Sequence, residues 1–161
     1  LGTAVHRLLE VLPNAPQDQW GNIAQRLLEA DIQAAAFQEA RTVLQQPELA
    51  YIFAPESLAE VDISAHLPEL NGDPIQGSID RLLISPTRVL AVDFKSNQIV
   101  PSEVAQVPSG LLRQMGAYAA ALSQIYPHHD IETAILWTKT LELMPLPKDL
   151  VISSLANTPL T

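Results

Sequence analysis

The 161-residue sequence contains no cysteine, and this absence excludes several classes of protein and of functional site. A disulfide framework, a thiolate zinc site, an iron–sulfur cluster and a cysteine nucleophile are all excluded. A chain of this length buries roughly 70% of the surface that its unfolded form exposes, so it needs no crosslink to hold a core. We expect one domain over residues 1–161, and any metal site must use oxygen and nitrogen ligands.

Positive charge is also scarce. Nine Lys and Arg stand against eighteen Asp and Glu, which gives a net charge of −9 at pH 7. The first 72 residues contain ten of these acids but only three Arg. This balance argues against a free-standing nucleic-acid-binding domain, because such domains ordinarily carry a basic surface.

Long apolar runs and a signal peptide are missing as well. No stretch of eighteen or more apolar residues occurs, and no basic, apolar and small-residue regions follow one another at the start. We therefore expect a soluble protein with no membrane partner. Because the chain opens on Leu1-Gly2 without Met, we also expect a fragment of a larger protein.

The hydrophobic pattern predicts an α/β domain with a helical N-terminal region. Apolar steps of three and four residues predict helices over 3–12, within 17–46 as a pair, over 109–125 and over 148–156. Short β-rich runs between turns predict a meander over 58–67, 75–85 and 89–96, and two closing strands over 131–138 and 141–146. Residues 96–108 have no period and contain two prolines, which indicates a loop.

Asp93 and Lys95 are the first candidate site residues. They lie in the third predicted strand, where side chains alternate between faces, so they point the same way while Val92 and Phe94 pack on the other face. A carboxylate and an ammonium would then share one pocket. The alternative is a solvated pair on an exposed strand.

Asp80 is predicted on the neighbouring strand, thirteen residues before Asp93 with a turn between them. Antiparallel pairing would bring the two carboxylates together, and like charges that are buried require either a raised pKa or a bound cation. Oxygen ligands without thiolate favour Mg²⁺ or Mn²⁺ over zinc. The alternative is an ordinary ion pair of Asp80 with Arg81 or Arg88.

Two helical pairs add further candidates. His6 lies one turn before Glu10, and its imidazole could supply a third ligand, although a packed or solvated histidine is the alternative. Gln114 and Tyr118, four residues apart, present an amide and a phenol side by side. Without the other motifs they would indicate only a helix face against the sheet.

Taken in order, the motifs resemble the RecB-like branch of the PD-(D/E)XK nucleases. The resemblance covers residue 2 to about residue 146, and its parts are Gly-x-x-x-His-x-x-Leu-Glu at 2–10, Glu60, Gly-x-Ile-Asp-Arg at 77–81, Asp-Phe-Lys at 93–95 and Gln-x-x-x-Tyr at 114–118. Within this branch the chain is most similar to the C-terminal nuclease domain of the AddA subunit of bacterial AddAB helicase-nucleases. The AddB nuclease carries an iron–sulfur cluster on cysteines, which are absent here.

The resemblance implies a restriction-endonuclease-like α/β fold, with a central mixed sheet flanked by helices, and a role for each motif residue. Asp80 and Asp93 would bind Mg²⁺, for which Mn²⁺ could substitute, with His6 and the Phe94 carbonyl as further ligands. Lys95 would orient or activate the attacking water. The remaining roles are secondary: Glu60 would position a second metal or a water, Gln114 and Tyr118 would support the site or contact the DNA backbone, and residues 17–46 would only pack.

The implied function is Mg²⁺-dependent hydrolysis of DNA phosphodiesters by an exonuclease module in bacterial, cytoplasmic double-strand break repair. A helicase would deliver a single-stranded DNA end, and an AddB-like subunit would be the partner. The net charge of −9 predicts weak intrinsic affinity for DNA, in agreement with delivery by a helicase. Two alternatives remain: a non-catalytic interaction domain that tethers a helicase to its partner, and a stand-alone RecB-like exonuclease.

Overall fold

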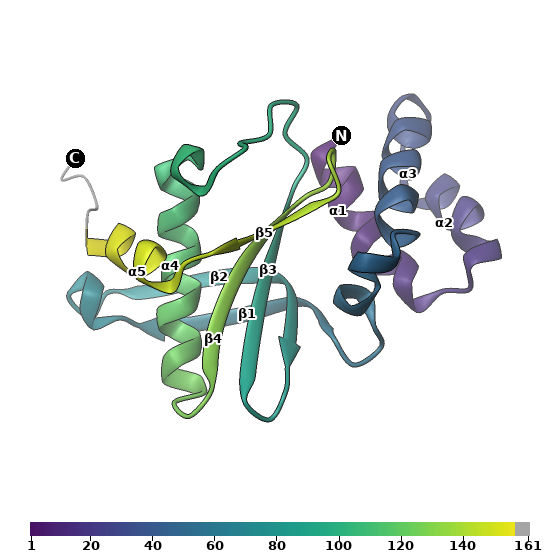
Figure 1. The fold of residues 1–161 in the computed structure, drawn as a ribbon. Coiled ribbons are helices and arrows are strands. Elements are labelled where there is room, and N and C mark those ends of the chain that lie inside the picture. Colours follow the sequence, from purple (N-terminus) through teal and green to yellow (C-terminus); the bar gives the residue numbers. More distant parts are fainter. Residues whose placement is uncertain (157–161) are drawn as a thin grey trace.

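Five strands form one mixed sheet in the computed structural model, which describes residues 1–156 (Figure 1). The strands lie side by side in chain order: β1 (Leu58–His66), β2 (Pro74–Ile84), β3 (Arg88–Lys95), β4 (Asp130–Trp137) and β5 (Glu142–Leu146). The first three are antiparallel, which confirms the predicted meander, and β5 is antiparallel to β4. Only β3 and β4 run parallel. The predicted α/β fold with a central mixed sheet is confirmed.

Helix α4 (Ser109–Ile125) makes the crossover that parallel neighbours require, and it covers one face of the sheet. Met115, Tyr118 and Leu122 are buried along its inner side, as the periodicity predicts. The C-terminal helix α5 (Lys148–Ala156) packs beside it (Figure 1). No helix within residues 1–156 is long and apolar enough to cross a membrane.

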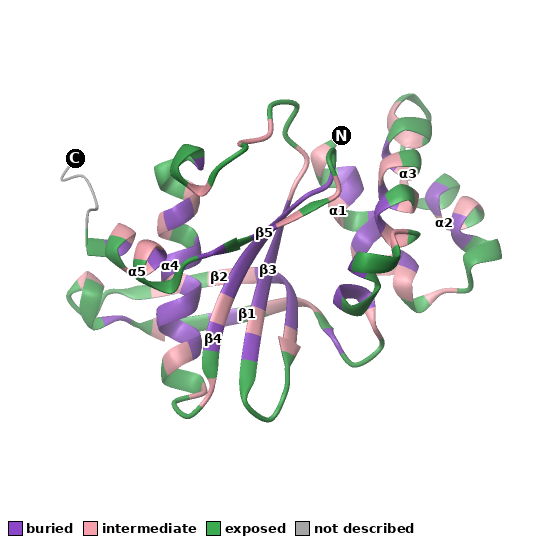
Figure 2. Cartoon of the chain, in the orientation of Figure 1, coloured by how far each residue is buried: buried purple, intermediate pink, exposed green. Residues whose placement is uncertain are grey.

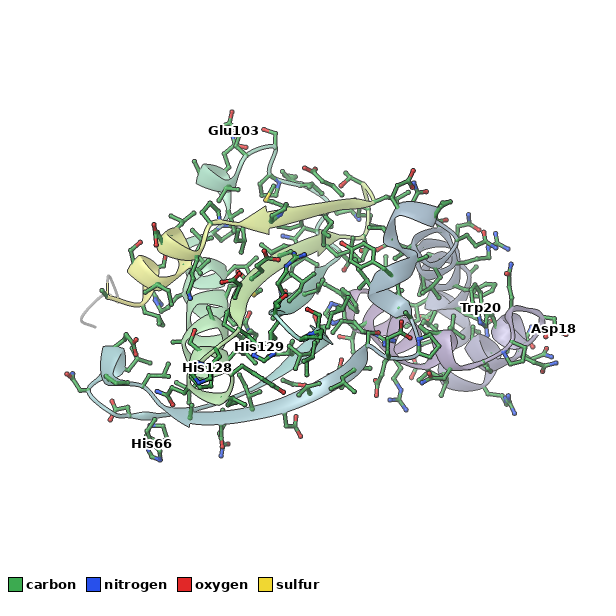
Figure 3. All side chains as sticks on the ribbon, turned by 60° about the horizontal axis from the view of Figure 1, so that its bottom comes forward. Asp18, Trp20, His66, Glu103, His128 and His129 are labelled. Carbon is green, nitrogen blue, oxygen red and sulfur yellow. The ribbon has the colours of Figure 1, made fainter. Side chains whose placement is uncertain are left out.

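The opposite face is covered by the N-terminal helices. Helix α1 (Gly2–Val11) packs its buried leucines with Val92 and Phe94 of β3 in a second apolar cluster, and α3 (Ala30–Leu44) packs against α1. The short α2 (Trp20–Leu27) lies at the far end of this region, where Figure 3 labels Asp18 and Trp20. Figure 2 shows the buried residues of β3 and β4 between the two groups of helices. The sheet therefore separates two apolar clusters.

The boundaries of the elements agree with the sequence prediction to within a few residues, and the main differences are short 3-10 turns. One such segment, Pro47–Phe53, buries Leu49, Ile52 and Phe53 in the second cluster. Others occupy Gln17–Gln19, just before α2, and Val104–Gln106, inside the predicted loop. Segments this short have no sustained periodicity, and their form depends on the surface that they meet.

Gly116 tests the packing of α4 on α5. A Cβ at this position would lie 2.0 Å from the Val151 carbonyl oxygen, and backbone cannot give way as a flexible side chain does. We expect Gly116→Ala to lower the free energy of unfolding by roughly 1–3 kcal/mol, as in other overpacked interiors. Urea denaturation measures this change.

Gly110 provides the control on the same helix. A Cβ there has nothing within 4 Å, so Gly110→Ala should leave stability unchanged or raise it by up to about 1 kcal/mol. Equal effects of the two substitutions would contradict the close approach of α5.

Candidate active site

Strands β2 and β3 separate next to two aspartates. Their ladder includes Arg81 opposite Val92, and just beyond this pair the Phe94 N–H donates to Asp80 Oδ2 at 2.7 Å. The carboxylate thus takes the place that a strand carbonyl occupies elsewhere in the ladder. Asp80 and Asp93 are both buried, so the predicted meeting of two carboxylates occurs in the interior.

Asp93 and Lys95 point to the same side of β3, as the strand alternation predicts. Lys95 Nζ lies 2.8 Å from Asp93 Oδ2, and Val92 and Phe94 are buried in the cluster on the opposite side. The alternative of a solvated pair on an exposed strand is wrong, because Asp93 is only 5% exposed. The Lys95 side chain is partly exposed, so the ammonium lies between the buried carboxylate and solvent.

Glu60 lies opposite Asp80 on the neighbouring strand β1. Register pairs flank it on both sides, Ala59 with Arg81 and Val61 with Ile79, whereas Glu60 itself has a φ of 50°. This left-handed backbone is uncommon for a residue with a side chain, and such strain is concentrated at functional sites. The Ser78 hydroxyl donates to Glu60 Oε2 at 3.1 Å, which holds a third carboxylate near the two aspartates.

The surroundings of Asp80 make its carboxyl group costly to ionise. Burial and the nearby Asp93 and Glu60 carboxylates raise the pKa of Asp80 from 3.8 to about 7, against the opposing effects of the Phe94 N–H and the Lys95 ammonium. The site therefore has more negative charge than Lys95 neutralises. A bound cation is the usual remedy for such an excess.

His6 reaches the same place from α1. A carbonyl oxygen only accepts hydrogen bonds, so His6 Nε2 donates to the Phe94 carbonyl at 2.7 Å, and His6 Nδ1 faces Asp80 Oδ1 at 3.8 Å. The ring also contacts the Phe94 ring edge-on. The two groups predicted as accessory ligands are thus adjacent, but in this structure they bond to each other.

The other three histidines lie elsewhere. Figure 3 shows His66 at the end of β1 and His128 with His129 in the turn after α4. That turn adjoins the start of β3, where Arg88 is opposite Asp130, and so lies at the other end of the strand from Lys95. Of the four histidines, His6 is the one beside the carboxylates.

The donor set at the site fits a hard divalent cation. Asp93 Oδ2 is buried and accepts no hydrogen bond from the described residues beyond its ion pair with Lys95. The 3.8 Å between His6 Nδ1 and Asp80 Oδ1 is too long for a hydrogen bond, but two ligands of one ion with bonds of about 2.1 Å are separated by up to roughly 4.2 Å. Within residues 1–156, however, no three His, Asp or Glu side chains already converge as a metal site.

Tyr118 and Gln114 join α4 to this part of the sheet. Tyr118 donates its hydroxyl hydrogen to the Ser78 carbonyl at 3.0 Å, and Gln114 Nε2 donates to the Tyr118 oxygen at 3.1 Å. Burial, with Asp93 and Asp80, raises the pKa of Tyr118, which keeps the phenol protonated as a donor. A Cβ at Gly77 would lie 2.8 Å from the Tyr118 ring, so this motif position requires glycine for space.

Arg81 has a structural position that the sequence did not reveal. Its guanidinium is buried on the α1 side, where Nη2 donates to the Leu9 carbonyl near the end of α1 and Nη1 donates to Ser57 Oγ. Arg88 instead pairs with Glu132 at the surface. The alternative of an ion pair between Asp80 and either arginine is therefore wrong. The sequence alone could have indicated that Arg81 points away from Asp80, because adjacent residues of a strand lie on opposite faces.

A family model for the PD-(D/E)XK nuclease superfamily matches residues 1–145, which include every residue of the site and all of the sheet except the last residue of β5. The chain belongs to the PD-(D/E)XK nuclease superfamily. Members of this superfamily are usually nucleases and generally use divalent metal ions. No curated protein matches the chain significantly in sequence. The restriction-endonuclease-like fold expected of the superfamily is the one described above.

The raised pKa of Asp80 predicts how stability depends on pH without metal. The unfolded chain ionises Asp80 near pH 3.8 and the folded chain near pH 7, so this carboxyl group favours the folded state at low pH and the benefit is lost as the pH rises through 7. Asp80→Asn cannot ionise and keeps an oxygen for the Phe94 N–H. At pH 8 in EDTA we expect this variant to exceed the wild type in unfolding free energy by on the order of 1–4 kcal/mol.

Denaturation curves at several pH values test this prediction. The gain of Asp80→Asn should shrink as the pH falls from 7 toward 4, whereas Asp62→Asn, at an exposed position on β1, should show no comparable trend. A gain of the same size at pH 4 and pH 8 would mean that the substitution acts through packing and not through charge.

Proposed function

We propose that this chain is a Mg²⁺-dependent deoxyribonuclease module that hydrolyses DNA phosphodiesters as an exonuclease. The observation that carries the proposal is the gathering of Asp80, Asp93 and Lys95 on two neighbouring strands of a PD-(D/E)XK fold. Two buried carboxylates beside one ammonium are suited to binding a cation and an anionic substrate together.

Asp80 and Asp93 would hold the metal, with His6 and the Phe94 carbonyl as additional ligands. A bound Mg²⁺, or Mn²⁺ in its place, supplies Lewis-acid polarisation of the phosphoryl oxygen and favours ionisation of a water molecule. His6 would bind through Nδ1, the nitrogen that faces Asp80, while Nε2 keeps its hydrogen bond to Phe94, and the Phe94 carbonyl would bind through its second lone pair.

Lys95 would act on the substrate. Its ammonium is held by Asp93 at the edge of the buried cluster, where it can orient the attacking water and offset charge on the scissile phosphate. Glu60 would position a second metal or a water. Gln114 and Tyr118 would keep β2 in place through Ser78 or contact the DNA backbone.

The distribution of cations supports delivery of DNA by another protein. Half of the eight Lys and Arg other than Lys95 make an ion pair within the chain or are buried: Arg7 with Glu10, Arg88 with Glu132, Lys139 with Glu39, and Arg81 in the interior. Few remain to bind a polyanion, so intrinsic affinity is weak. We infer that a helicase presents a single-stranded end to this module, with an AddB-like partner, in double-strand break repair in the bacterial cytoplasm.

Lys95→Ala tests the proposed catalytic role. At low salt with Mg²⁺, the wild-type protein should degrade end-labelled single-stranded DNA slowly, and Lys95→Ala should reduce the rate by about 100-fold or more, as loss of one preorganised charge does elsewhere. Lys148→Ala removes an exposed lysine at the start of α5 and should leave the rate unchanged. Full activity in Lys95→Ala would contradict the assignment. No cleavage by the wild type, alone or with a helicase, would favour the interaction domain.

Metal binding is tested separately from cleavage. Mg²⁺ or Mn²⁺ that binds only the folded protein should raise its melting temperature. At a metal concentration 100 times the Kd, the free energy of unfolding should increase by about 2.7 kcal/mol. Asp93→Asn should lose most of this shift, whereas Asp62→Asn should keep it. Equal shifts in the two variants would mean that the ions bind elsewhere.

A further inference from the structure

The last residue of β3 is held from one side only. The paired register of β2 with β3 reaches Val92, whereas that of β4 continues to Lys95, which is opposite Trp137. One residue later the Thr138 N–H donates to the Lys95 carbonyl at 2.9 Å. Lys95 then leads directly into the loop before α4, so the position of its backbone depends on Thr138.

Thr138 is in turn held by the N-terminal helices. Its side chain is buried, and its hydroxyl donates to Glu39 Oε2 at 2.6 Å. The Thr138 hydroxyl oxygen also lies 3.2 Å from the Lys95 carbonyl oxygen. The other Glu39 oxygen pairs with Lys139 Nζ at 2.6 Å. Glu39 belongs to α3, and its side chain is only 9% exposed. One carboxylate thus holds both residues that follow β4.

We infer that Glu39 and Thr138 are positioning residues that hold Lys95 in place for the reaction. The inference rests on the proposed function of Lys95. It corrects the expectation that residues 17–46 only pack, because α3 supplies a hydrogen-bonded carboxylate at the end of the catalytic strand.

The chemistry of the contact favours positioning over simple stabilisation. Burying a carboxylate is costly, and an apolar side chain at the same place would hold α3 against the sheet at lower cost. An apolar side chain cannot orient the Thr138 hydroxyl and the Lys139 ammonium, because it accepts no hydrogen bond from either. A displacement of about 1 Å at a catalytic group can reduce the rate 100-fold, so a directional contact at a strand end has a large effect.

Helix α1 reinforces the same strand end. A Cβ at Gly2 would lie 2.7 Å from Ser96 Oγ, so the first residue of α1 approaches the residue after Lys95 closely. Helices α1 and α3 therefore both reach the chain next to the Lys95 carbonyl: α3 through Thr138 and α1 at Ser96.

Kinetics of the full chain test the inference. Thr138→Val removes the hydroxyl at nearly constant volume, and Glu39→Ala removes its acceptor while keeping a good helix former. Each should lower kcat about 10- to 100-fold with less than about a twofold change in KM, and the double variant should be no worse than the more damaging single variant. Thr138→Ser keeps the hydroxyl and should restore kcat.

Glu132→Gln is the matched control, because this carboxylate also lies on β4 but pairs with Arg88 at the exposed end of the strand. It should leave both constants unchanged. Unchanged kcat in folded Thr138→Val and Glu39→Ala, or additive losses in the double variant, would overturn the inference.

Hydrogen exchange without DNA gives an independent measurement. Amides at 93–98 and at Thr138 should exchange at least tenfold faster in Thr138→Val and Glu39→Ala than in the wild type, Thr138→Ser or Glu132→Gln. Unchanged exchange would overturn the inference even if cleavage were lost. A wild-type protein that cuts no DNA would contradict the proposed function, and the exchange rates would still decide whether Glu39 and Thr138 hold the end of β3.

Discussion

The hydrogen bond from the Phe94 N–H to the Asp80 carboxylate is the contact on which the arrangement of the site depends. It lies where β2 and β3 leave their shared ladder, and it replaces a strand carbonyl with a charged acceptor. Hydrogen bonds to ionised groups are roughly twice as strong as those between neutral groups, so this contact offsets part of the repulsion from Asp93. Without it, separation of the strands would let the two carboxylates move apart.

Both faces of the sheet contribute to this one place. Helix α1 brings His6 to the Phe94 carbonyl from one side, and α4 brings Tyr118 to the Ser78 carbonyl from the other. These contacts are made to backbone next to the carboxylates and not only to the carboxylates themselves. The geometry of the acidic residues is therefore maintained by the two apolar clusters, which hold α1 and α4 in position.

The excess of acidic over basic residues affects the binding of both metal and DNA. Burial and neighbouring carboxylates raise the pKa of Asp80, and several of the few basic side chains, Arg7, Arg88 and Lys139, form ion pairs within the chain. Such a protein is well suited to bind a divalent cation and poorly suited to capture DNA by itself. Membership of the PD-(D/E)XK nuclease superfamily agrees with the first property, and delivery by a partner is our account of the second.

The sequence by itself determined the order of helices and strands and the identity of the motif residues, because periodicity and strand alternation act over a few neighbouring positions. Asp93 and Lys95 on one face, and Gln114 beside Tyr118, follow from those local rules. Only the tertiary structure decided that Arg81 on β2 donates a hydrogen bond to the Leu9 carbonyl of α1. The same holds for the hydrogen bond that Thr138 donates to Glu39, 99 residues away in the chain. Neither contact has a local pattern, since a polar side chain on a helix or strand finds its partner only after the packing of distant apolar faces has brought the two together.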